Sequence, residues 1–229
     1  MRIDYRSFTK KYIKPKKNQF PTGSVVYKGF QGSGKTLSLV HDIFELQKKF
    51  PECVVFSNIK IRGLNNFYFI VNDDDLVRAL QFRNGDKGVL ICLDEAHLFF
   101  GKKTGISLDV LTAISQQRKD RKRLIFTSQI WEELDISLRK QVKEVISCRC
   151  ILGRFQFNSV SNGETIAWDN LKSCYTAQHI RYDLFKHNQQ LYDSYDTFQK
   201  ILRNTEYERS TTSNYSFNSI NITTTKSKK

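Results

Sequence analysis

The sequence predicts an α/β fold with a mainly parallel central sheet flanked by helices, followed by a β-hairpin nearer the C-terminus. Two observations predict this fold. Apolar segments of strand length alternate with segments of helical periodicity, and parallel strands need such crossover connections. In addition, residues 89–93 (Val-Leu-Ile-Cys-Leu) are continuously apolar, which is typical of a strand buried on both faces of a parallel sheet.

The elements follow one another in a regular order. β-branched and aromatic residues mark the strands, and apolar residues three or four positions apart mark the helices. The first helix has this spacing up to Phe50, and Ser107 is a predicted helix cap. The predicted strands lie at 25–27, 53–56, 67–71, 89–93, 124–127 and 142–152. The predicted helices follow residue 36, open with the acidic run 73–75, follow Ser107, and lie around 134–140.

The texture of the sequence changes after Gly153. Phe155, Phe157 and Val160 alternate with polar residues, which is the pattern of a half-exposed strand. Asn162-Gly163 is a favoured pair for a tight hairpin turn. We therefore predict a hairpin appendage at about 153–169, with residues 165–168 as its return strand at the edge of the sheet.

Three regions are predicted along the chain. Residues 1–20 are rich in lysine and arginine and form a basic N-terminal arm. Residues 21–204 form the main domain, including the hairpin appendage. Residues 205–229 are rich in Ser, Thr and Asn, and their low apolar content predicts a flexible tail.

Residues 29–36 (Gly-Phe-Gln-Gly-Ser-Gly-Lys-Thr) form a phosphate-binding loop of the form G-x-x-x-x-G-K-[ST]. The glycines let the backbone form a nest of N–H groups that point at phosphate oxygens, and the next helix directs its positive dipole end at the same anion. Lys35 brings charge to the outer phosphates and Thr36 is placed to bind Mg²⁺. The predicted nucleotide-binding residues are Gly29, Gln31, Gly32, Ser33, Gly34, Lys35 and Thr36.

Asp94 and Glu95 follow the buried strand 89–93, which is the Walker B arrangement. Asp94 would hold the hydrated Mg²⁺ together with Thr36, and Glu95 would polarise the attacking water. An acidic residue in this place favours hydrolysis over binding alone. Neither Asp-x-x-Gly after the strand nor Asn-Lys-x-Asp occurs, which favours ATP over GTP.

His97 completes the string Asp-Glu-Ala-His, which one class of helicases shares. Those enzymes close two such domains on their nucleotide, and this chain has room for one. We interpret His97 as a local packing or coupling residue.

Two further residues are candidates for catalysis. Gln129 follows the strand at 124–127, which we place beside the Walker B strand, so that its side chain would touch the γ-phosphate or its water. The basic segment 118–123 lies between a helix and a strand. A phosphate-loop ATPase often takes an arginine from a neighbouring subunit, and Arg118 is the first candidate and Arg139 the second. The alternative for this segment is a solvated helix end, or contact with DNA phosphates.

The composition bounds the partners and the compartment. The 229 residues carry a formal net charge of +14, which favours a nucleic-acid partner over an anionic membrane surface or a merely basic surface. The 5 cysteines lie mostly in apolar runs, which predicts reduced, buried thiols in a cytosolic setting. No apolar run is long enough for a membrane span, and none follows the basic N-terminus as a signal peptide requires.

The three motifs together resemble the FtsK–HerA superfamily of DNA-pumping ATPases. They are Gly-Phe-Gln-Gly-Ser-Gly-Lys-Thr, Cys-Leu-Asp-Glu-Ala-His, and the segment from Gln116 to Gln129. Within it, the chain is similar to the genome-packaging ATPases of membrane-containing icosahedral viruses and to the zonula occludens toxin-like ATPases of filamentous phages. The resemblance implies a RecA-like P-loop NTPase fold and a homo-oligomeric ring, with a hexamer favoured and sites at subunit interfaces. It also implies catalytic roles for Lys35, Glu95, Gln129 and Arg118.

The predicted function is therefore an ATPase, dependent on ATP and Mg²⁺, that moves double-stranded DNA. Packaging of a viral genome into a capsid is favoured, in the host cytoplasm or on the virion, with capsid or membrane-vertex proteins as further partners. Two alternatives stay open. One is an assembly or secretion ATPase that acts at a membrane, and the other is a nucleotide-gated binding switch that turns over slowly.

Overall fold

The computed structural model describes residues 19–102 and 105–196. The predicted tail at 205–229 and all but the last two residues of the predicted arm lie outside the described residues, so both stay predictions. In the described part of the chain, no helix combines the length and the apolar character needed to cross a membrane.

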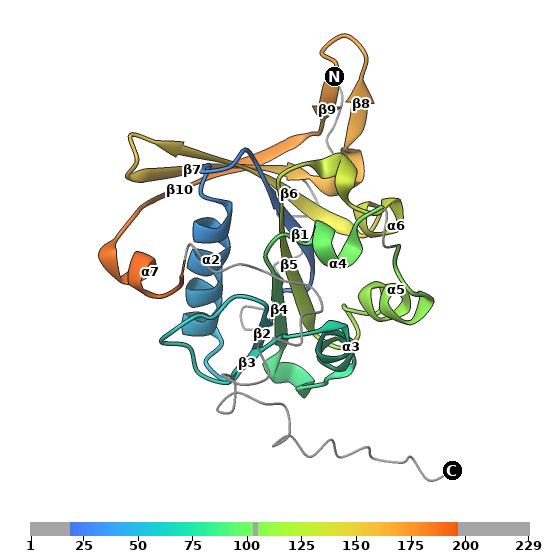
Figure 1. Ribbon diagram of the computed structural model, residues 1–229, viewed down its shortest axis with the longest axis vertical. Helices are drawn as coiled ribbons and strands as arrows, with labels where there is room; N and C mark the ends of the chain where they lie inside the picture. The colour runs from blue at the N-terminus through green and yellow to red at the C-terminus, as the bar shows by residue number, and fades with distance from the viewer. Residues whose placement is uncertain (1–18, 103–104, 197–229) are drawn as a thin grey trace.

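One twisted sheet of 8 strands forms the centre of the molecule (Figure 1). Its strands are β1 (Gly23–Lys28), β2 (Val54–Ser57), β3 (Phe67–Phe69), β4 (Val89–Leu93), β5 (Lys122–Ser128), β6 (Val142–Ile151), β7 (Phe155–Asn162) and β10 (His179–Lys186). Their order across the sheet is β10-β7-β6-β1-β5-β4-β2-β3. The six strands from β6 to β3 are parallel, and β7 and β10 extend the sheet with antiparallel pairing. The predicted α/β fold with a mainly parallel sheet is confirmed.

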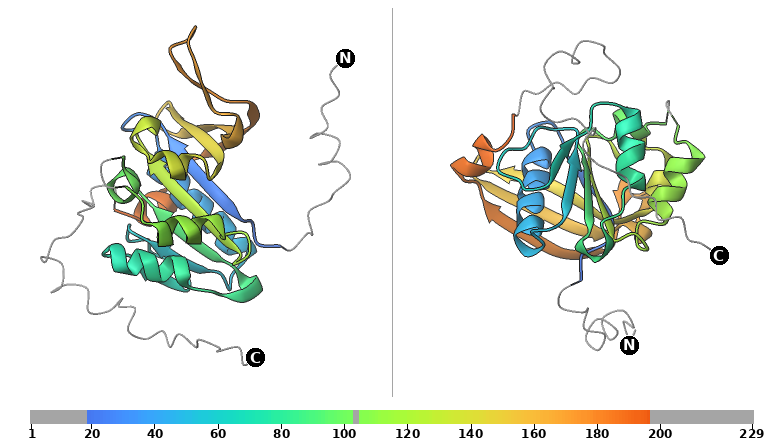
Figure 2. Two further views of the ribbon diagram at one scale, coloured as in Figure 1. Left: turned by 90° about the vertical axis from the view of Figure 1, so that its right-hand side faces the viewer. Right: turned by 90° about the horizontal axis from the view of Figure 1, so that it is seen from below.

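Helices cover both faces of the parallel part of the sheet (Figure 2). The helix α2 (Lys35–Lys49) packs on one face, together with the short α7 (Gln189–Asp193) near the end of the described chain. The other face carries α3 (Asp73–Gln81), α4 (His97–Phe100), α5 (Leu108–Ser115) and α6 (Ile136–Arg139). Three short 3-10 helices, η1 (Gly85–Lys87), η2 (Trp131–Glu133) and η3 (Gly163–Thr165), lie in the connections.

The two cores reflect the alternation of side chains along each strand. In β1, Val26 packs into the core beneath α3, α4 and α5, whereas Val25 and Tyr27 pack into the core beneath α2. Every residue of β4 is buried, as predicted from its continuous apolar run. The strand that ends in Asp94 is therefore fixed from both sides.

The helix starts follow the predicted capping chemistry. Ser107 accepts a hydrogen bond from the N–H of Val110 and caps α5. The acidic residues at 73–75 lie in the first turn of α3, where they face the positive end of the helix dipole, and Asn72 caps that helix. Strand β3 ends at Phe69 instead of the predicted residue 71, because Asn72 already starts the next helix.

An antiparallel hairpin is present nearer the C-terminus, as predicted, but its predicted return strand and turn are wrong. β6 and β7 form the antiparallel pair, and their connection is at 152–154. Asn162 caps η3 through the N–H of Glu164 instead of making a two-residue turn. The returning residues form β8 (Ala167–Asp169), which pairs with β9 (Cys174–Thr176) in a separate two-stranded sheet, and β10 takes the place beside β7.

All five cysteines are free thiols. Cys53, Cys92 and Cys148 are buried, and burial raises the pKa of Cys53 to about 11 and that of Cys148 to about 12. These three thiols therefore stay protonated near neutral pH, as expected for structural residues. Cys174 is exposed, contrary to the prediction of buried thiols. No group of three His, Cys, Asp or Glu side chains that could hold a metal ion occurs within the described residues.

Candidate functional site

The phosphate-binding loop connects the carboxyl end of β1 to the first turn of α2. Gly34 immediately precedes α2 with a φ of 82°, a conformation that favours glycine. A Cβ atom at Gly34 would also collide with the side-chain amide of Gln156. Lys35 folds back onto the loop, and its Nζ donates a hydrogen bond of 3.1 Å to the carbonyl of Phe30. The loop therefore has the shape of a phosphate cradle, with its lysine held at the rim.

Strand β7 supports the loop from behind. The Gln156 Nε2 donates a hydrogen bond of 2.9 Å to the carbonyl of Ser33, and Asn158 is hydrogen-bonded to Ser38 in α2. Both Gln156 and Asn158 are buried. The antiparallel extension of the sheet thus holds the loop and the start of α2 in place.

Asp94 lies at the centre of a set of hydrogen bonds. Its carboxylate accepts bonds of 3.0 and 3.1 Å from the Thr36 hydroxyl and one of 2.6 Å from the Thr127 hydroxyl. Asn58, which follows β2, holds the Asp94 backbone at both its N–H and its carbonyl, each at 2.8 Å. Three neighbouring strands therefore fix this carboxylate beside the first turn of α2.

Burial is the main influence on the charge of Asp94, whose side chain is among the buried charged groups with 8% exposed. Burial raises the pKa of its carboxyl, which the hydrogen bonds from Thr127 and Thr36 partly oppose; Glu95 raises it further and Lys35 lowers it. A buried carboxylate beside a hydroxyl is a donor set that suits Mg²⁺. Thr36 and Asp94 thus fit the predicted metal, because a bound cation would compensate the buried charge.

We expect Asp94→Asn to raise the melting temperature of the nucleotide-free protein. The pKa of the Asp94 carboxyl is higher in the folded state than in the unfolded state, so ionisation of this carboxyl destabilises the fold. The penalty is fully present at a pH above the folded-state pKa. It disappears as the pH falls below the unfolded-state pKa. Differential scanning fluorimetry at pH 7.5 should show the gain, and the gain should shrink in acid. Mg²⁺-ATP should stabilise the wild type more than the variant.

Glu45→Gln is the matched control. Glu45 is exposed on α2, and its substitution removes the same negative charge away from the site. It should leave the melting temperature and the effect of Mg²⁺-ATP unchanged. A lower melting temperature for Asp94→Asn than for the wild type would contradict the assigned cost of the buried carboxylate.

Glu95 adopts an unusual backbone conformation directly after β4. Its φ of 51° is uncommon for a residue other than glycine, and such strain is frequent at functional sites. Its N–H donates to the Thr127 hydroxyl at 2.9 Å, and the N–H of Ala96 donates to the Thr127 carbonyl at the same distance. These bonds to β5 direct the Glu95 side chain to the edge of the sheet where the loop lies.

Gln129 is hydrogen-bonded to the Glu95 carboxylate, and His97 lies close to it. Gln129 Nε2 donates to Glu95 Oε1 at 3.2 Å, and His97 Nδ1 lies 3.3 Å from Glu95 Oε2. The His97 and Glu95 atoms are within ion-pair distance, yet neither has a well-aligned hydrogen bond. The structure therefore places Gln129 against the predicted catalytic base, because β5 and β4 are neighbours as predicted.

The predicted arginines lie at the other end of the sheet. Arg118 is exposed and precedes β5, whereas the phosphate-binding loop follows the carboxyl end of the parallel strand β1. Arg139 precedes β6, which also runs parallel to β1. One copy of the chain therefore brings neither arginine to its own loop, and a role in a neighbouring site stays a prediction.

Part of the basic segment serves the fold. Asp120 forms ion pairs with Arg83 at 3.2 Å and Lys122 at 3.0 Å, and Arg121 pairs with Asp86 at 3.1 Å. Lys122 is buried and also donates to the carbonyl of Leu80. Arg118 and Lys119 are the bases of this segment that point into solvent without an ion pair among the described residues.

Four polar residues of this site were not predicted from the sequence. Asn58 and Thr127 end buried strands, and polar residues at the carboxyl ends of neighbouring parallel strands are a usable signal. Gln156 and Asn158 lie on β7, and no local pattern predicted that this strand would pack behind the loop. Their position depends on the long-range pairing of β7 with β6.

The fold is shared with known proteins, and a family model matches most of the chain. The family model for zonular occludens toxin (Zot) matches residues 24–199. The N-terminal domain of zonular occludens toxin from Neisseria meningitidis has a similar structure, with a TM-score of 0.52 and 17% identity, over 76% of this chain and 98% of that chain. The genome packaging NTPase from Sulfolobus turreted icosahedral virus 2, in complex with sulfate, has a TM-score of 0.51 and 13% identity, over 69% of this chain and 96% of that chain. No curated protein sequence matches the chain.

Proposed function

Because the chain belongs to the zonular occludens toxin family, we propose that it is a Mg²⁺-dependent ATPase that couples hydrolysis to the movement of DNA. The observation that carries this proposal is the convergence of the loop, Thr36, Asp94 and the Gln129–Glu95 pair at one edge of the sheet. The unusual backbone conformation of Glu95, together with its contact with Gln129, supports hydrolysis over phosphate binding alone.

The roles of the side chains follow from their positions. The backbone of residues 29–34 and Lys35 would bind the phosphates, and Thr36 with Asp94 would hold Mg²⁺, which neutralises developing charge on the phosphates. Glu95 would accept a proton from the water that attacks the terminal phosphorus, while the bond from that phosphorus to its bridging oxygen breaks. Gln129 would orient Glu95 and the water.

DNA is proposed as the moving partner because the chain carries a formal net charge of +14. Double-stranded DNA and packaging of a viral genome are the first candidate, and a neighbour with the same fold is described as a genome packaging NTPase. A membrane-associated assembly or secretion ATPase is the second candidate, and the family match favours it. An oligomeric ring is proposed in both.

The test is the ATPase rate of the full chain at low salt, with and without a linear DNA duplex. We expect the duplex to bind and to raise the rate, and we expect the stimulation to disappear as salt is raised, since phosphate contacts release counterions. Heparin is the control for a nonspecific effect of a polyanion. Hydrolysis that duplex DNA does not change would refute coupling to duplex movement, and the absence of hydrolysis would refute the ATPase.

A further inference from the structure

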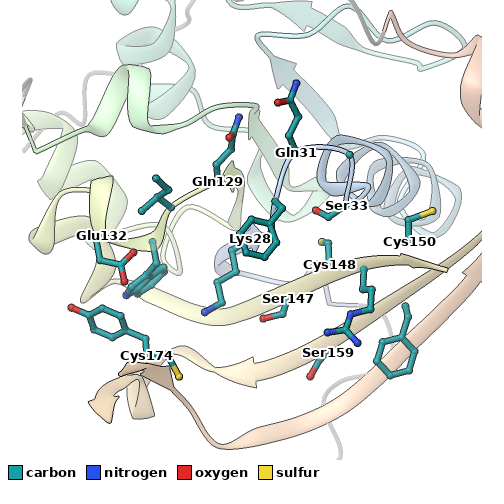
Figure 3. A pocket seen from close by; sticks show the side chains of 18 of the residues that line it. Lys28, Gln31, Ser33, Gln129, Glu132, Ser147, Cys148, Cys150, Ser159 and Cys174 are labelled. Carbon is teal, nitrogen blue, oxygen red and sulfur yellow. The ribbon is translucent and has the colours of Figure 1, made fainter. Parts of the chain in front are cut away.

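A cleft of about 910 Å³ lies beside the phosphate-binding loop, on the face of the sheet opposite α2 (Figure 3). Its volume is at the upper end of the range of ligand sites, about 300–1,000 Å³. Residues 28–33 and Gln129 form one wall, the strands β6, β7 and β10 form the floor, and the β8–β9 pair forms the opposite wall. The cleft shares residues 29–33 and Gln129 with the proposed nucleotide site, but Lys35, Thr36, Asp94 and Glu95 do not line it, so the part beyond the loop is available for another ligand.

The floor consists of two rows of side chains. The strand register aligns Lys28, Ser147, Ser159 and Tyr182 across β1, β6, β7 and β10. Arg149 and Phe157 pair with each other two residues farther along their strands, so they point to the same side. Farther back along β6, Val145 points to the same side of the sheet and is buried in the core beneath α3, α4, α5 and α6. The cleft therefore lies on the uncovered part of that sheet face.

Aromatic rings line the cleft on two sides. Phe157 and Tyr182 form a pair on the floor with ring centroids 4.9 Å apart, and Trp168 and Tyr175 form a pair on the β8–β9 wall with centroids 5.2 Å apart. Tyr182 is 57% exposed and Trp168 is 52% exposed. The His179 ring also lies against Tyr182, with centroids 4.1 Å apart, so the exposed part of this ring and the Trp168 ring are the surfaces offered to a planar ligand.

Two cations accompany these rings. Lys28 and Arg149 line the cleft, and no hydrogen bond or ion pair from the described residues engages either side chain. Burial lowers the pKa of Lys28, which the nearby Glu132 carboxylate partly opposes, so the ammonium would gain from an anionic partner. Glu132 is the single carboxylate among the lining residues, which leaves the cleft basic.

We propose that this cleft binds an unpaired nucleic-acid strand, with its phosphates at Lys28 and Arg149 and its bases stacked on the two aromatic pairs. Stacking surfaces combined with cations are the chemistry that holds single strands without regard to sequence. Of the three floor strands, β6 and β7 are paired on both sides and β10 alone has a free edge, so an added peptide strand would pair beside β10 and away from Lys28 and Arg149. The inference rests on the proposed nucleic-acid function and specifies an unpaired segment of the DNA as the part that contacts the motor beside Gln129.

The test is the binding of a fluorescein-labelled dT20 strand to the full chain, measured by anisotropy without nucleotide and compared with a labelled 20-base-pair duplex. We expect the wild type to bind dT20 more tightly than the duplex. Trp168→Ala and Tyr182→Ala should each weaken dT20 binding about tenfold, the effect of losing one stacked base. Arg149→Gln should reduce the slope of log K against log salt by about 0.7, the value for one phosphate contact on a single strand.

Matched controls lie on the same elements. Leu171, 98% exposed between β8 and β9, and Leu184, 68% exposed on β10, do not line the cleft, so Leu171→Ala and Leu184→Ala should bind dT20 as the wild type does. Lys143→Gln removes an exposed charge from β6 outside the cleft and should preserve the salt slope.

The inference is overturned if the aromatic variants bind dT20 like the wild type, or if the control variants lose as much affinity for dT20 as the aromatic variants do. It is also overturned if the wild type binds the duplex more tightly than dT20 and every variant loses the same affinity for both. Since these assays contain no nucleotide, they are independent of hydrolysis. A chain that passes them but does not hydrolyse ATP would refute the proposed ATPase alone. A chain that hydrolyses ATP with binding unaffected by the cleft variants would refute the strand site alone.

Discussion

We expect Glu95→Gln to bind ATP as the wild type does and to hydrolyse it about 10²- to 10⁴-fold more slowly, the range for loss of a general base. The substitution keeps the shape of the side chain and its contact with Gln129, which lies 3.2 Å from Glu95 Oε1. It removes the proton acceptor. Ground-state binding should persist because the loop, Thr36 and Asp94 are unchanged, so the loss should fall on the rate constant for hydrolysis.

The measurement pairs single-turnover hydrolysis of ATP with equilibrium binding of a nonhydrolysable ATP analogue. Glu133→Gln is the control. Glu133 is exposed in η2, and its substitution removes the same negative charge outside the site. It should keep the wild-type rate and affinity. Turnover by Glu95→Gln within about threefold of the wild type would falsify the assignment of Glu95 as the base, since it leaves less than 1 kcal/mol of the barrier to that residue.

The sequence predicted the parts of the site whose signals are local. Residues 29–36 combine a motif with a preceding strand and a following helix, and Asp94 follows an apolar run that is typical of a buried strand. The strand before Gln129 was predicted to lie beside the Walker B strand, and the structure has β4 and β5 as neighbours. For these residues the chain connectivity alone restricts the geometry.

The rest of the site depends on contacts that no local pattern encodes. Gln156 lies 123 positions beyond Ser33, whose carbonyl it binds, and its position is set by the pairing of β7 with β6. The prediction of a tight turn at 162–163 was wrong for a related reason. Asn162 and Gly163 do favour a tight turn, but Asn162 instead caps η3, and Gly163 packs against the backbone of Val142. Tertiary packing overrode the local preference, and β10 took the edge beside β7.

We expect Arg118→Ala to abolish ATP hydrolysis and to regain it in mixtures with Glu95→Gln. Arg118 precedes the amino end of β5, and Gln129 follows the carboxyl end of the same strand, whose 7 residues span roughly 20 Å. The arginine therefore cannot reach the loop of its own chain, whereas a neighbouring copy in a ring could present it. Loss of such an arginine lowers hydrolysis about 10³- to 10⁵-fold.

The mixture makes the prediction specific. A site in a mixed ring is complete when a subunit with Arg118→Ala, which keeps Glu95, adjoins a Glu95→Gln subunit, which keeps Arg118. Random assembly of equal amounts gives about a quarter of such interfaces, so the mixture should recover about a quarter of the wild-type rate although each variant alone is inactive. Lys119→Ala, which changes the neighbouring exposed base, should stay fully active. An inactive mixture, with both variants shown to assemble together by mass, would leave Arg118 without a role in its neighbour's site, and Arg139 would be the next arginine to test in the same way.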